Sequence, residues 1–258
     1  GHFIRKKQLP WFGLAIYGGG IAILYFATYA AFQIYNLLPQ SSSFSIMVLI
    51  TILACATAIA YETQALAIIG LIGGFLTPIL MSTGQDNYVV LFSYMAILNA
   101  GILVISFRKR WATLQALGFV VTYFIFTMWY VDRYNPNKFW AAILFLNVSY
   151  VTYSLVPFAY YFLRKEAQQL SGFYILILNS VVALAFNFVM IKGKYPLEWM
   201  SVITVFYAII FLFFAYQISR QGEIGRNALV VMLLKSTLFL ILTIPLLFSQ
   251  HWITIFWT

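Results

Sequence analysis

The sequence predicts an all-α integral membrane protein, a polytopic helical bundle of about nine full transmembrane helices plus the start of a tenth. Of its 258 residues 63% are apolar and only 8% are charged, whereas a soluble domain carries about 25% charged residues. The mean hydropathy is +0.91, and apolar runs of about 20 residues, long enough to cross a bilayer as helices, follow one another along the chain. The runs are continuous rather than alternating, which excludes a transmembrane barrel.

The first five spans are apolar runs separated by short polar turns. The first carries three consecutive glycines near its middle, and the basic residues 108–110 separate the fourth run from the fifth. These five spans are expected at residues 11–35, 44–61, 65–82, 88–107 and 111–131.

The remaining spans are bounded in the same way, with basic residues at 164–165 and 192–194. They are expected at residues 139–163, 171–191, 198–218 and 227–249, and a tenth starts near Trp252. Connections of a few residues make sequential helices antiparallel neighbours. We expect residues 1–258 to be one transmembrane domain of a longer chain, because the first residue is not Met and the last apolar run is unfinished.

Lysines and arginines are distributed unevenly between alternate loops. Ten lie on the side of the N-terminus, at Arg5, Lys6, Lys7, Arg108, Lys109, Arg110, Arg164, Lys165, Arg220 and Arg226. Four lie on the other side, at Arg133, Lys138, Lys192 and Lys194. Because short basic loops stay in the cytoplasm, this difference predicts a cytoplasmic N-terminus. The net charge of +9 therefore reflects topology, and no nucleic-acid partner is expected.

Short polar turns recur along the chain at roughly regular intervals. They are YETQAL, RKRWATL, RKEAQQL and RQGEIGR, and each leads directly into the next helix. Three spans also carry a Leu–Asn pair, at residues 98–99, 146–147 and 178–179. These patterns predict a repeated helical hairpin that opens to one side, as occurs both in transporters and in inert scaffolds.

The chain contains few residues suited to catalysis or metal binding. It has one cysteine, Cys55, and two histidines, His2 and His251. The chain therefore offers almost no residues for a histidine base or a multi-histidine metal site. All six acidic residues fall in loops or at span ends, so a buried carboxylate relay is not expected. No catalytic, metal or cofactor site is predicted, and an enzyme is not favoured.

Two charged residues are candidates for a pocket. Lys235 lies eight residues after Asn227, about 12 Å into a hydrocarbon core of about 30 Å. Leaving it unpaired there costs at least about 2.5 kcal/mol. We therefore expect it to face an anionic or carbonyl group in a pocket, to snorkel, or to pair with helix carbonyls. Glu62 lies at a tight, otherwise uncharged turn, where a solvated residue is the simpler interpretation.

Four asparagines within spans are the other pocket candidates: Asn99, Asn147, Asn179 and Asn187. The last two are eight residues apart, which places them on nearly one helical face. They are expected either to hydrogen-bond between helices, at about 0.6 kcal/mol each, or to line a polar cavity.

The segment GGFLTPILMSTG at residues 73–84 interrupts an apolar run with small residues and a proline. Gly70, Gly73 and Gly74 have the spacing of close helix packing. Pro78 removes the hydrogen bond to the carbonyl of Gly74 and bends the helix, and Thr77 or a neighbouring helix can satisfy that carbonyl. The first span offers a matching surface, at Gly18, Gly19 and Gly20. Either two helices pack closely here, or broken helices expose backbone to a substrate.

These glycine segments also carry a family resemblance. YGGGIAILYFATYAAF at residues 17–32 and QALAIIGLIGGFLTPILMSTG at residues 64–84 resemble the hallmark segments of a family of large bacterial membrane proteins, domain of unknown function 2339. FLILTIPLLFSQHWITIFWT at residues 239–258 is similar to a later block of that family, and residues 135 to 225 match only in hydrophobic pattern. The resemblance implies a longer multi-pass protein and assigns no functional residue.

Two functions are compatible with these observations. The first is transport or translocation of a small or amphipathic solute, with a pocket between the glycine-rich helices and Lys235. The second is a structural or assembly subunit of a cell-envelope membrane complex. The expected location is the bacterial inner membrane, and the expected partners are the lipid bilayer, other membrane subunits or the remainder of the chain.

Overall fold

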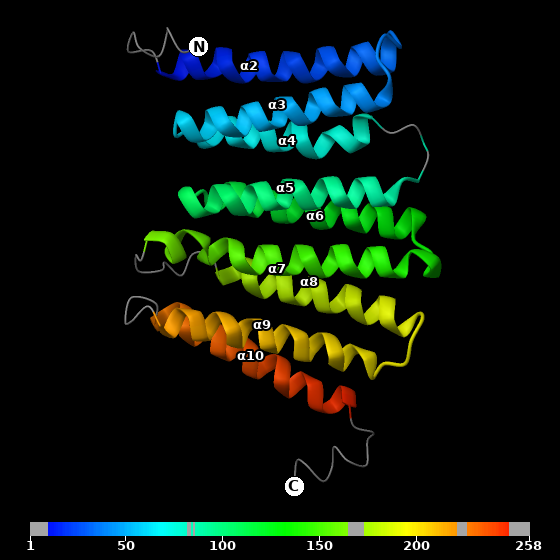
Figure 1. The fold of residues 1–258 in the computed structure, drawn as a ribbon, viewed down its shortest axis with the longest axis vertical. Helices are drawn as coiled ribbons and strands as arrows, with labels where there is room; N and C mark the ends of the chain where they lie inside the picture. Colours follow the sequence, from blue (N-terminus) through cyan, green and yellow to red (C-terminus); the bar gives the residue numbers. More distant parts are fainter. Residues whose placement is uncertain (1–9, 82–83, 85, 165–172, 221–225, 248–258) are drawn as a thin grey trace. The chain divides into compact units, whose positions relative to one another are not determined.

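The computed structural model describes residues 10–81, 84, 86–164, 173–220 and 226–247. This part of the chain contains nine α-helices and no β-strand (Figure 1). Eight of its helical segments are long and apolar enough to cross a membrane. The all-α membrane fold is therefore confirmed, while the tenth span expected near Trp252 lies outside the described residues.

The helices follow the predicted spans closely. They are α2 (Pro10–Tyr29) with its π-helical continuation η1 (Ala30–Ile34), α3 (Gln40–Ala60), α4 (Gln64–Leu80), α5 (Tyr88–Arg108), α6 (Ala112–Arg133), the 3-10 turn η2 (Pro136–Lys138), α7 (Phe139–Arg164), α8 (Phe173–Lys192), α9 (Trp199–Ser219) and α10 (Arg226–Leu247). The largest difference is at α3, which begins four residues before the predicted start at residue 44. Pro39 lies before it in an extended conformation, and the serines that follow are tolerated in the first turn, where backbone N–H groups lack helical partners.

Sequential helices pack as hairpins across the four polar turns. The pairs α3/α4, α7/α8 and α9/α10 are packed side by side. The pair α5/α6 is joined by a hydrogen bond of 2.8 Å from the Thr122 hydroxyl to Asn99 Oδ1. The repeated hairpin that the polar turns indicate is therefore present in the structure.

The chain divides into two compact units, each with its own core. Unit 1 comprises residues 1–105 and 111–128, and unit 2 comprises residues 106–110 and 129–258. Met47, Ala54 and Phe75 are among the buried residues of unit 1. In unit 2 the core includes stacked aromatic rings, from Tyr150, Tyr207, Phe211 and Phe239.

Candidate functional site

Lys235 in unit 2 is enclosed by groups from three other helices. Its Nζ lies 4.2 Å from the ring centroid of Phe211 on α9 and 5.6 Å from that of Tyr150 on α7. The same Nζ donates a hydrogen bond of 3.3 Å to the carbonyl of Leu176 on α8. Ring faces attract an ammonium because the aromatic quadrupole is negative there. We call this group, Lys235 with Tyr150, Phe211 and the Leu176 carbonyl, the lysine cage.

The ammonium of Lys235 contacts a helix carbonyl near the start of α8. Lys235 is nine residues into α10, about 13.5 Å along the axis, whereas Leu176 is only three residues into α8, about 4.5 Å. Both helices begin at the same end of unit 2 (Figure 1). Of the expected environments of Lys235, the structure shows pairing with a helix carbonyl; snorkelling, for which the lean of helical side chains toward the helix N-terminus would direct the charge to that end, stays a prediction.

Asn147, Asn187 and Tyr207 form a closed hydrogen-bonded ring across α7, α8 and α9. Asn147 Nδ2 donates to Asn187 Oδ1 at 3.1 Å. Asn187 Nδ2 donates to the Tyr207 hydroxyl at 3.0 Å, and that hydroxyl donates to Asn147 Oδ1 at 2.5 Å. The second amide hydrogens go to the carbonyls of Ile143 and Ala183. All four amide donors are thus engaged within the protein, and we call this arrangement the amide ring.

Asn179 joins α7 and α8 through two further hydrogen bonds. It is fully buried, and its Nδ2 donates to the Tyr150 carbonyl at 2.8 Å and to Ser154 Oγ at 3.1 Å. The fourth asparagine, Asn99, lies in unit 1 and accepts from Thr122. The structure therefore brings Asn147, Asn179 and Asn187 together with Lys235 in one helix group, and it does not place Asn99 in that group.

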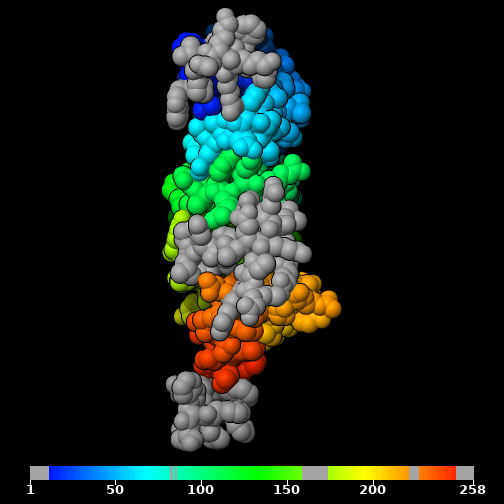
Figure 2. Space-filling model, turned by 90° about the vertical axis from the view of Figure 1, so that its left-hand side faces the viewer, coloured from blue at the N-terminus to red at the C-terminus, as the bar shows by residue number. Residues whose placement is uncertain are grey.

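The glycines of α4 lie against neighbouring helices of unit 1. A Cβ at Gly70 would be 2.6 Å from that of Ala54 on α3, one at Gly74 would be 3.0 Å from Thr51 Cγ2, and one at Gly73 would overlap the Tyr25 ring on α2. Figure 2 shows α3 and α4 (light blue to cyan) in continuous contact on the face that it presents. Of the three glycines in α2, only Gly18 faces α4, where its Cβ would lie 2.8 Å from Ile69 Cδ1; at Gly19 and Gly20 a Cβ would meet no described atom within 4 Å.

A tyrosine hydroxyl satisfies the backbone carbonyl that Pro78 leaves open. Pro78 lies inside α4 and lacks the N–H that would bond the Gly74 carbonyl. Tyr94 of α5 donates to that carbonyl at 2.9 Å, while the Thr77 hydroxyl donates to Gly73 at 2.9 Å. The neighbouring helix, rather than Thr77, thus replaces the missing hydrogen bond.

Glu62 holds the turn between α3 and α4 in a left-handed conformation, with φ at 54°. Its N–H bonds to Ile59 at 3.2 Å, and the next N–H, of Thr63, bonds to Ala58 at 2.9 Å. These two bonds form a Schellman motif, in which glycine is the usual residue at the left-handed position. The side chain is exposed and lies outside both the lysine cage and the amide ring.

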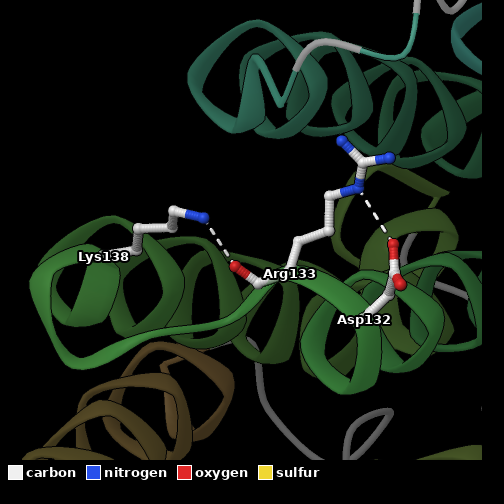
Figure 3. Close-up of polar contacts among 3 residues, drawn as sticks. All are labelled: Asp132, Arg133 and Lys138. Carbon is white, nitrogen blue, oxygen red and sulfur yellow. Dashed lines mark hydrogen bonds and ion pairs between the residues drawn. The ribbon is translucent and has the colours of Figure 1, made fainter.

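Basic residues at the opposite end of unit 2 hold its loops together. Lys138 Nζ donates to the Arg133 carbonyl, and Arg133 Nε pairs with Asp132 Oδ2 at 2.9 Å (Figure 3). Lys194 Nζ donates to the Pro136 carbonyl at 2.7 Å and lies 5.2 Å from the ring centroid of Phe139. These cations stabilise the turns next to α7 and α9.

The aromatic members of these sites are not marked in the sequence. Tyr150, Tyr207 and Phe211 were not singled out, because an aromatic residue in an apolar run is indistinguishable from ordinary core packing. Tyrosine does carry one usable signal: its hydroxyl needs a partner when buried, so a tyrosine in mid-span is expected to meet a polar group on a facing helix.

Comparisons with known proteins give the chain a family but no activity. A family model described as a predicted membrane protein (DUF2339) matches residues 1–258. Among curated proteins and among solved structures, no match was found.

Proposed function

Because the chain belongs to the family of predicted membrane proteins DUF2339, whose description names no activity, we propose a function from the packing of its helices: a structural or assembly subunit of a membrane complex. The distribution of lysine and arginine supports a cytoplasmic N-terminus, and the location proposed with it is the bacterial inner membrane. In this function the described helices form a fixed membrane framework on which other subunits assemble.

The amide ring is the observation that carries this proposal. Its three side chains come from three successive helices, and three hydrogen bonds link them in a closed ring. Tyr207 is also stacked on Tyr150, with ring centroids 3.9 Å apart. A pathway for a solute between these helices would break the ring and leave buried amides unpaired, each at about 1–3 kcal/mol.

Close packing of glycines supports the same function in unit 1. Membrane helices associate by van der Waals contact between small residues, since lipid tails supply no hydrophobic force between them. The contacts of Gly70 with Ala54 and of Gly73 with Tyr25 bring α2, α3 and α4 together in this way.

Transport of a small or amphipathic solute is the alternative, and it has one observation in its favour. Lys235 is an ionisable group within a membrane span, and such a residue in a span is by default a functional candidate. One observation counts against transport. A solute pathway requires water to reach the part of α8 that carries Asn179 and Asn187, and both side chains are fully buried.

Cysteine accessibility distinguishes a fixed framework from a transport pathway. In a Cys55→Ala background, Ala183→Cys and Asn187→Cys test the buried face of α8, and Lys194→Cys is the exposed control. We expect a small hydrophilic thiol reagent to label position 194 in intact membranes, and to label 183 and 187 only after denaturation in SDS. Labelling of 183 and 187 at the rate of 194 would contradict the framework and favour transport.

The assembly part of the proposal has its own measurement. The protein, tagged at its chromosomal locus and extracted in a mild detergent, should migrate on a native gel as a complex with other membrane subunits in fixed ratio. Migration of the single chain alone would overturn the assembly function while leaving the packed framework intact.

A further inference from the structure

We propose that the lysine cage binds the anionic headgroup, phosphate or carboxylate, of an amphipathic molecule that reaches it from the lipid. The inference concerns a ligand of unit 2 and does not depend on the assembly function. It is carried by the charge, the hydrogen bonds and the exposure of Lys235.

The charge of Lys235 has no carboxylate partner in the described part of the chain. The acidic residues described there are at turns or helix ends, at Glu62, Asp86, Asp132 and Glu198, and the contacts of Lys235 are those with Leu176, Tyr150 and Phe211. A cation at this depth without a counter-charge is costly. An anion from outside the chain would remove that cost.

Among the described residues, the one hydrogen bond of Lys235 leaves most of its donor capacity unused. An ammonium has three donors, and here one of them reaches a carbonyl at the long distance of 3.3 Å. That carbonyl already accepts from the Ser180 hydroxyl at 2.8 Å. A phosphate or carboxylate oxygen offers a stronger acceptor, because hydrogen bonds between two charged groups are roughly twice as strong as neutral ones.

Lys235 is reached from the lipid side of α10. Its side chain is partly exposed, and its neighbours Leu234 and Leu238 are 64% and 53% exposed. The described part of α10 lies at the surface in the view of Figure 2 (orange to red). A ligand that approaches over these leucines moves through hydrocarbon, so its anionic group has to be attached to an apolar chain.

The end of unit 2 at which α10 begins is basic. Arg220 follows α9 at that end and is exposed, and Arg226 begins α10 in the sequence. Basic residues at the membrane surface attract anionic lipids. A headgroup held near Arg220 therefore has the ammonium of Lys235 as the next cation deeper in the membrane.

Lipid retention by the purified protein tests the proposal. The wild-type protein and Lys235→Met are exchanged into phosphatidylcholine with and without phosphatidylglycerol, and bound lipid is counted by native mass spectrometry. We expect wild type to retain phosphatidylglycerol over phosphatidylcholine, and Lys235→Met to bind phosphatidylglycerol about tenfold more weakly, the size of one charge-assisted hydrogen bond. Lys194→Met removes an equal charge from the opposite end of unit 2 and should behave as wild type.

A second variant controls for misfolding, and a second anion tests whether the ligand comes from the lipid or from water. Lys235→Arg keeps the charge and should keep the lipid preference. Inorganic phosphate that binds wild type as strongly as phosphatidylglycerol does, and that does not bind Lys235→Met, would support the anion site with a water-borne ligand. Equal retention of both lipids by wild type, or equal retention of phosphatidylglycerol by wild type and a folded Lys235→Met, would overturn the proposal.

Discussion

Single polar residues in the spans of this protein act mainly through other residues of the chain. Asn147, Asn179 and Asn187 each hydrogen-bond to a facing helix. Their importance was predictable from the sequence because asparagine is unusual in an apolar run. Their partners were not predictable, because spacing along one helix does not say which helix faces it or at what height.

The amide ring gives a prediction at this scale. Tyr207→Phe removes one hydroxyl and leaves both Asn147 Oδ1 and an Asn187 donor without their partner. We expect a loss of about 1–3 kcal/mol in the free energy of unfolding, measured by SDS titration of the purified protein. Tyr216→Phe, on the same helix but 56% exposed, is the matched control and should change stability by less than about 0.5 kcal/mol. An equal response of the two variants would show that the ring contributes nothing to stability.

At the scale of the element, helix α4 combines every feature that the sequence singled out around residue 73. Its glycines contact α2 and α3, and its proline opens a carbonyl that α5 satisfies. The small residues and the kink position were readable from the sequence, since both follow from local chemistry. The donor was not, because Tyr94 lies 16 residues beyond Pro78 on another helix.

Pro78 and Tyr94 should therefore be energetically coupled. Tyr94→Phe leaves the Gly74 carbonyl unpaired and is expected to cost about 1–3 kcal/mol in the free energy of unfolding. In the Pro78→Ala background the helix regains its own N–H donor for that carbonyl, so the same change should cost less. A double-mutant cycle by SDS titration measures the difference, expected at about 0.5–3 kcal/mol. Strictly additive effects would exclude the hydrogen bond as the link.

At the scale of the whole molecule, the sequence predicted the helix pattern well and the division into units not at all. Span ends agree with the helices to within four residues, because apolar runs and basic turns mark them directly. The unit boundary crosses α5 after residue 105, the α5–α6 loop after residue 110 and α6 after residue 128. The basic run at residues 108–110 lies at this boundary. A similar run at residues 164–165 lies within unit 2, so such a run does not by itself indicate a unit boundary.

Membrane topology is the prediction at this scale. Arg110→Cys and Lys194→Cys, each in a Cys55→Ala background, lie in loops on opposite sides if the excess of basic residues sets the orientation. We expect an impermeant thiol reagent added outside spheroplasts to label position 194 and to label position 110 only after permeabilisation. The reverse pattern would invert the topology, and labelling of both from outside would contradict the number of spans between them.

The length of α4 has a consequence for the surrounding lipid. Its 17 residues extend about 25 Å, which is shorter than the roughly 30 Å of a typical hydrocarbon core. Ile72, Leu76 and Ile79 on this helix are exposed, so lipid tails adjoin it. Such a hydrophobic mismatch is accommodated when the bilayer becomes a few ångströms thinner beside the short helix or when a partner covers it, so α4 is the side of unit 1 where a thinner bilayer or an oligomeric contact is expected.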